Sequence, residues 1–116
     1  MTANSNFDGI YLVLGSNLME EIRAKDNNKG ILFFTSDFNE LRNAEIVGNT
    51  YGIYFDSADS NLLEEILVRR NEEGVLLRYS KNNTLTNSII ENNQKSGISL
   101  YYAGSSSEPN LIFNNL

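Results

Sequence analysis

The chain has 116 residues, with 9 Lys and Arg against 15 Asp and Glu, and a formal net charge of −6 at pH 7. This length predicts one domain over residues 1–116, and an acidic chain without a basic stripe is not expected to bind nucleic acid. The absence of His and Cys excludes Ser-His-Asp and Cys-His catalysis, and also zinc or copper sites with the usual nitrogen and sulfur ligands. No apolar run is long enough for a membrane span.

The first residues have no basic region and only a short apolar run, so we do not expect them to be a signal peptide. We therefore expect either a cytosolic protein or a piece of a secreted one.

In chain order, a glycine opens a short apolar segment and an asparagine unit follows it. The glycine segments cover residues 9–13, 30–34, 52–56, 74–78 and 97–101. Asparagine recurs every 22 residues in two columns. The first is Asn17, Asn39, Asn61 and Asn83, with Ser105 in the fifth place, and the second is Asn27, Asn49, Asn71, Asn93 and Asn115. Two columns in one register predict five repeats of 22 residues.

Apolar residues within each repeat fall into columns that predict three short strands. Residues such as Ile31 and Phe33 alternate with a period of 2, which is the period of side chains along a strand. Glu21, Asn43, Glu65, Asn87 and Pro109 share one column, which we interpret as a bend between strands. Three short strands per repeat, separated by turn residues, predict a β-solenoid of about five coils.

Stacking in register explains the columns. We expect the asparagines to hydrogen-bond to one another and to adopt left-handed turn conformations. We also expect the glycines to adopt backbone angles that a Cβ would forbid. Residues 22 apart would become neighbours, and several such pairs have opposite charges: Arg23 with Glu45, Arg69 with Glu91, Glu73 with Lys95, and Asp56 with Arg78.

The repeated pattern is N-x-[LIM]-x-x-x-x-[IVA]-x-x-N…G-[IV]-x-[LF], clearest in residues 61–77 and 83–100. It resembles the right-handed parallel β-helix repeat family, which includes NosD-like periplasmic proteins, carbohydrate-binding proteins and sugar hydrolases. The resemblance implies an all-β, right-handed, single-stranded parallel β-helix and an extracellular or cell-surface location. The lack of histidine counts against the copper role suggested by the NosD name and against the family's epimerases. The domain is interpreted as a fragment of, or module from, a longer solenoid.

The outward residues of the glycine strands form the most suggestive surface. Flat aromatic rings on a rigid sheet suit the apolar faces of sugar rings. The candidate ligand-binding residues are Phe34, Tyr54, Asp56, Arg78, Tyr79, Tyr101 and Tyr102. The alternative is that this face packs against another domain or a partner.

Asp37 and Asp59 are neighbours in the predicted stack, so their oxygens are a candidate Ca²⁺ site; no other cofactor is expected. The alternative is a solvated turn in which Lys81 offsets the second carboxylate.

Three functions stay open. They are a non-catalytic module binding polysaccharide or protein, part of a carboxylate-based polysaccharide lyase or glycoside hydrolase, and a purely architectural rod. Because both ends expose strand edges, end-to-end self-association or further coils are also expected.

Overall fold

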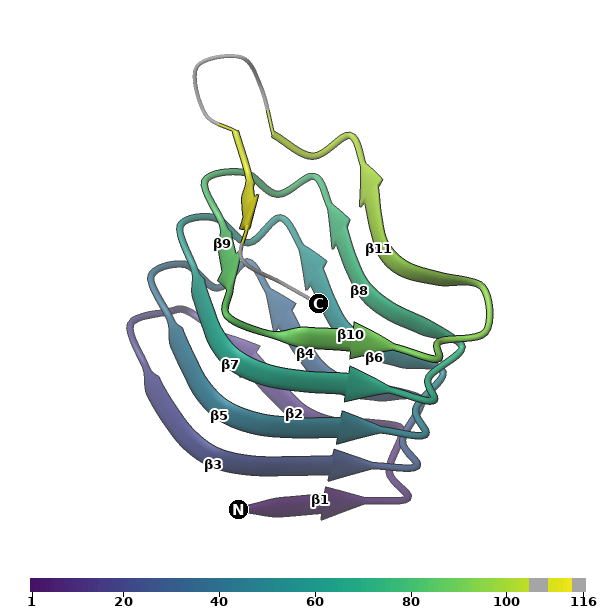
Figure 1. Ribbon diagram of the computed structural model, residues 1–116. Coiled ribbons are helices and arrows are strands. Elements are labelled where there is room, and N and C mark those ends of the chain that lie inside the picture. The colour runs from purple at the N-terminus through teal and green to yellow at the C-terminus, as the bar shows by residue number, and fades with distance from the viewer. Residues whose placement is uncertain (105–108, 114–116) are drawn as a thin grey trace.

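The computed structural model describes residues 1–104 and 109–113 (Figure 1). Its strands are β1 (Thr2–Asn4), β2 (Asp8–Val13), β3 (Leu18–Lys25), β4 (Lys29–Phe34), β5 (Glu40–Val47), β6 (Tyr51–Asp56), β7 (Leu62–Arg69), β8 (Glu73–Arg78), β9 (Thr84–Thr86), β10 (Ile89–Glu91), β11 (Ser96–Tyr101) and β12 (Leu111–Phe113). None of the described segments is a helix long and apolar enough to cross a membrane.

The strands wind into a parallel β-solenoid of about five turns with ~22 residues per turn, as predicted. One face is a five-stranded sheet in the order β11-β8-β6-β4-β2. The other strands form a seven-stranded sheet in the order β1-β3-β5-β7-β9-β12, with β10 beside β7. Every strand pair is parallel, and residues 22 apart face each other through the middle of the stack.

The seven-stranded sheet is folded along the predicted bend column. Glu21, Asn43 and Glu65 have left-handed φ angles of 53°, 50° and 57°, and each lies inside one strand of 8 residues. The predicted second and third strands are therefore continuous in these coils. Among the described coils, they separate in the fourth, where β9 and β10 flank the left-handed Asn87.

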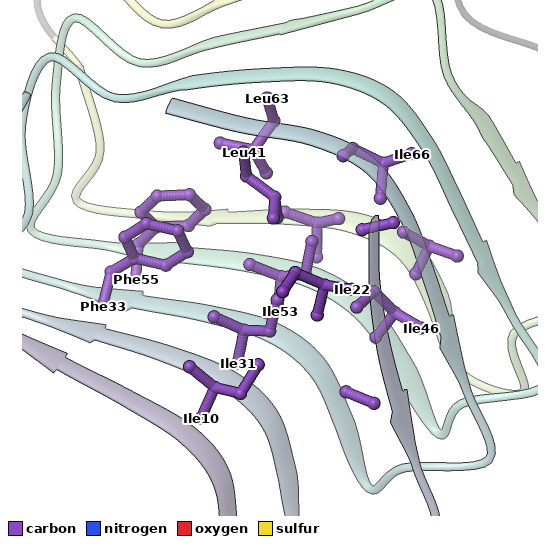
Figure 2. Packing of buried hydrophobic residues seen from close by; sticks show 14 of the residues in the cluster. Ile10, Ile22, Ile31, Phe33, Leu41, Ile46, Ile53, Phe55, Leu63 and Ile66 are labelled. Atoms are coloured by element: carbon purple, nitrogen blue, oxygen red, sulfur yellow. The ribbon is translucent and has the colours of Figure 1, made fainter. Parts of the chain in front are cut away.

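The core fills the tube between the sheets. Ile31 and Ile53 are fully buried one above the other, and Val75 is 1% exposed beside them. The rings of Phe33 and Phe55 lie one above the other, as Figure 2 shows. They are stacked with their centroids 4.5 Å apart. These inward columns are confirmed, and their contact between neighbouring coils excludes water from the tube.

Both asparagine columns are hydrogen-bonded ladders. Asn49, for example, donates from Nδ2 and from its backbone N–H to Oδ1 of Asn71, at 3.0 and 2.9 Å. The same pair of bonds joins each ladder asparagine to the next one from Asn17 and Asn27 onward. From Asn17 to Asn93, however, the left-handed conformation belongs to the residue before each ladder asparagine, such as Phe38 or Arg70. The asparagine is needed for its amide and not for its φ angle.

The column glycines are needed for space. Gly30 and Gly52 do not have left-handed φ angles, so the expectation of forbidden backbone angles is wrong for them. A Cβ on Gly30 would lie 2.5 Å from the carbonyl oxygen of Gly52 and 3.0 Å from Nδ2 of Asn49. The ladder amide packs directly on the glycine backbone, and a side chain would displace it.

The last coil departs from the period of 22. Asn110, not Ser105, continues the first ladder, because it accepts from the backbone N–H of Asn83 at 2.9 Å and from its Nδ2 at 3.2 Å. Ile112 consequently lies beside Leu85 and not beside Ile90. Relative to the period of 22, the chain has one extra residue before Gly97 and four more between Gly97 and Asn110. Pro109 therefore precedes the ladder instead of occupying the bend column, and Ser105 and Asn115 lie outside the described residues.

The charge pairs follow the same register. Arg23 bonds to Glu45 at 2.6 Å, as predicted. The predicted pair of Glu73 with Lys95 is wrong, because the extra residue before Gly97 places Ser96 beside Glu73 and Lys95 on Glu72.

The N-terminal residues add a strand that the repeat did not predict. β1 pairs with the second half of β3, with Ala3 beside Ala24, and its alanine is buried. The backbone N–H of Asn6 donates to Oδ1 of Asn27 at 2.9 Å. The second ladder therefore begins 21 residues before Asn27 rather than at it.

Candidate functional site

The outer face of the five-stranded sheet carries the predicted ligand-binding residues. In register across the sheet, the end column holds Val13, Phe34, Asp56, Arg78 and Tyr101. A left-handed residue follows each strand, and in the last two coils it is Tyr79 or Tyr102. The predicted outward columns are thus confirmed as neighbours on one face.

Three tyrosines form a cluster at one end of this face. The rings of Tyr79 and Tyr102 are stacked at 5.7 Å with an angle of 3° between their planes. Tyr101 lies edge-on to both, at 6.1 Å from Tyr79 and 4.6 Å from Tyr102. All three side chains are exposed, at 48%, 51% and 74% for Tyr79, Tyr101 and Tyr102. Their mutual packing restrains the rings while leaving much of each ring surface in contact with water.

Arg78 adds a permanent positive charge to the cluster. Its guanidinium carbon lies 5.1 Å from the ring centroid of Tyr79 and 6.0 Å from that of Tyr101, which is cation–π distance. Interaction with the Tyr54 side chain, and then with Tyr79, raises the pKa of Arg78 above its ordinary value. In the part of the chain that the structure describes, its Nε is buried without a hydrogen-bond partner. The guanidinium is therefore held in place on the sheet and stays charged.

A shallow groove of about 490 Å³ runs beside this cluster. It is lined by Tyr51, Glu73, Leu76, Arg78, Ser99, Leu100 and Tyr101. The sequence prediction missed Tyr51 and Glu73. They lie opposite each other at the starts of β6 and β8. The signal was available, because this column also contains Asp8 and Lys29, so that Tyr51 is its one aromatic residue among charged neighbours.

The remaining predicted residues lie on the same face, outside the cluster of three tyrosines. Phe34 is 6.3 Å from the ring of Tyr11, toward the opposite end of the sheet. Tyr54 packs edge-on to Tyr51 at 5.2 Å. Asp56 stands between Phe34 and Arg78 in the same column. The seven residues therefore form one strip, in which Arg78 lies against the tyrosine rings on one side and interacts with Tyr54 on the other.

Asp37 and Asp59 have a structural role in the turns. Oδ1 of Asp37 accepts from the backbone N–H of Asp59 at 2.7 Å, and Oδ1 of Asp59 accepts from that of Lys81 at 2.9 Å. Among the described residues, no group of three or more acidic, His or Cys side chains is arranged to hold a metal ion. Calcium binding by this aspartate pair stays a prediction, and it would require their second carboxylate oxygens.

A second groove of about 490 Å³ crosses the bend of the seven-stranded sheet, where Glu21, Glu45 and Glu65 are among the lining residues. Hydrogen bonds from Arg23, and then from Arg69, lower the pKa of Glu45 below its ordinary value. A general acid in glycoside hydrolysis needs the opposite shift. Glu45 is therefore suited to an ion-pair ladder and unsuited to proton donation.

The chain was compared with known protein families, curated proteins and solved structures. The model described as "Right handed beta helix region" matches residues 2–116. No curated protein and no solved structure matches the chain.

Proposed function

The chain belongs to the family of right-handed β-helix regions, and we propose that it is a non-catalytic module that binds polysaccharide on the outer face of its five-stranded sheet. The observation that carries the proposal is the exposed cluster of Tyr79, Tyr101 and Tyr102 beside the groove. Tyrosine rings present apolar faces to the C–H faces of sugars, and their hydroxyls can exchange hydrogen bonds with sugar hydroxyls.

The polar groups of the groove complement the rings. Arg78 is a donor, Glu73 an acceptor, and Ser99 either one, and all three lie within the same groove lining. A binding site of this type combines apolar contact area with a few polar groups that fix orientation. Arg78 also favours polysaccharides with carboxylate or sulfate groups, because a guanidinium binds such groups with charge-assisted hydrogen bonds.

The test is a glycan array with neutral and acidic polysaccharides, followed by calorimetry on those that bind. We expect Tyr101→Ala to weaken binding by about tenfold, since a lost ring contact of roughly 1.4 kcal/mol corresponds to that factor. Phe38→Ala is the matched control. Phe38 is an aromatic residue that is 69% exposed in a turn between β4 and β5, away from the groove. Its loss should leave the affinity unchanged.

Two results would contradict the proposal. One is that no polysaccharide binds the wild-type chain, which would favour a protein partner or an architectural role. The other is equal loss in both variants. Release of reducing or unsaturated sugars from a bound polysaccharide would instead support the alternative of a lyase or hydrolase.

A further inference from the structure

We propose that the two ends of the solenoid are complementary and that a second copy of this chain stacks on them head to tail, in one register. The bend in the seven-stranded sheet divides it in two, so the solenoid has three faces. Five strands are stacked on each face. The first face consists of β2, β4, β6, β8 and β11. The second is the first half of β3, β5 and β7, followed by β9 and β12, and the third is β1, the second half of β3, β5 and β7, and β10.

Because each face has the same number of strands, the exposed strands at one end of the solenoid match those at the other end. The chain starts on the third face with β1 and reaches the second face with β12, and in the winding of the solenoid the third face always follows the second (Figure 1). A second copy placed on β11 and β12 therefore meets them with β2 and β3, while its β1 meets β10. Among the described strands, each of the three faces thus gains a partner strand at once.

The edge strands match in the core columns. Continuing the register of the sheet places Ile98 and Leu100 of one copy beside Ile10 and Leu12 of the next. Leu100 occupies the column of Phe33 and Phe55, which are buried, yet it is itself 55% exposed. Leu100 is thus a core position that lacks a covering coil within the described chain, and stacking would bury it.

The outer columns also change character toward the ends. In the middle of the stack, the last residue of the glycine strand and the residue after it are Asp56 and Ser57. At one end they are Tyr101 and Tyr102, and at the other Val13 and Leu14. These four end residues are all exposed, from 44% for Val13 to 79% for Leu14. On the second face, Leu111 and Leu18 are 51% and 62% exposed in one shared column. Head-to-tail stacking pairs apolar with apolar at each of these positions.

The asparagine ladder has a direction that permits only this polarity. Along the stack, each ladder asparagine donates forward from its backbone N–H and Nδ2, and accepts at Oδ1 from behind. Among the described residues, the backbone N–H of Asn110 has no acceptor and Oδ1 of Asn17 has no donor. Stacking a second copy places Asn17 where it would accept from Asn110. Two like ends would instead oppose donor to donor or acceptor to acceptor.

Disulfide trapping tests the register directly, because the chain has no cysteine of its own. Ser99 of one copy should stand beside Tyr11 of the next, at the separation of about 4.8 Å between stacked strands, which a disulfide can bridge. Mixing the Ser99→Cys chain with the Tyr11→Cys chain should give cross-linked dimer in at least about tenfold excess over Ser99→Cys mixed with Val13→Cys, which is displaced along the same strand. Equal yields from both mixtures, or Ser99→Cys joining mainly to itself, would overturn the proposal.

Sedimentation velocity across a concentration series tests the association itself. The wild-type chain should form dimers and longer species as concentration rises. Leu100→Lys should raise the dissociation constant at least about tenfold, since it would bury an unpaired charge at the junction. Phe38→Lys changes an exposed aromatic residue in the middle of the stack and should associate like wild type. A wild-type chain that stays monomeric, or equal association of Leu100→Lys and wild type, would refute head-to-tail stacking.

Discussion

Replacing Asn71 with alanine is expected to destabilise the fold by about 4 kcal/mol. Asn71 is fully buried, and its side chain makes four hydrogen bonds. Nδ2 donates to Oδ1 of Asn93 at 3.1 Å and to the carbonyl of Ile46 at 3.2 Å. Oδ1 accepts from the backbone N–H and from Nδ2 of Asn49, at 2.9 and 3.0 Å. At about 1 kcal/mol each, four bonds give this sum, and the buried N–H of Asn49 would be left without its acceptor.

Such a loss is large against a total stability of about 5–15 kcal/mol for a domain of this size. Urea denaturation followed by circular dichroism measures it as a fall in the midpoint at constant m value. Asn17→Ala is the matched control, because Asn17 begins the first ladder, is exposed, and loses only its bond to Asn39. We expect about 1 kcal/mol or less for that change. If both variants lost the same stability, the inter-coil amide bonds would not be what stabilises the stack.

Two further predictions concern the glycine column and the ion-pair ladder. Gly30→Ala should destabilise strongly or prevent folding, while Gly97→Ala should be milder, because among the described residues the added Cβ would meet only a methyl group of Ile90, at 3.3 Å. Thermal melts of both variants check this, and equal effects would contradict the packing argument. Hydrogen bonds from Arg23, and then from Arg69, lower the pKa of Glu45 from its ordinary value of 4.5. Ionised Glu45 therefore stabilises the fold above pH 4.5, and this stabilisation is lost as the pH falls through the lower pKa of the folded state. Glu45→Gln should cost roughly 0.5–1 kcal/mol at pH 7. The difference from wild type should shrink in acid, and a cost that did not depend on pH would refute the assignment.

Much of the fold follows from the sequence alone. In a solenoid each residue contacts its equivalent in the next coil, so a strict period places Ile31 beside Ile53, and Asn49 beside Asn71, without knowledge of any distant contact. The same logic predicted the bend at Glu21 and the pair of Arg23 with Glu45. Nearest-neighbour stacking makes such contacts readable from spacing.

The tertiary structure decided what spacing does not encode. Extra residues in a turn cost little free energy and leave no periodic mark, so the sequence did not reveal that the ladder continues at Asn110. The compact group of Arg78 with three tyrosines depends on side-chain directions at the left-handed Tyr79 and Tyr102, and a column assignment does not specify those directions. Exposure at Leu100 likewise follows from its place in the last coil, where an inward side chain has no further coil above it among the described residues. Periodicity determines which residues are neighbours within the stack, whereas the ends and turns interrupt it and so need the three-dimensional structure.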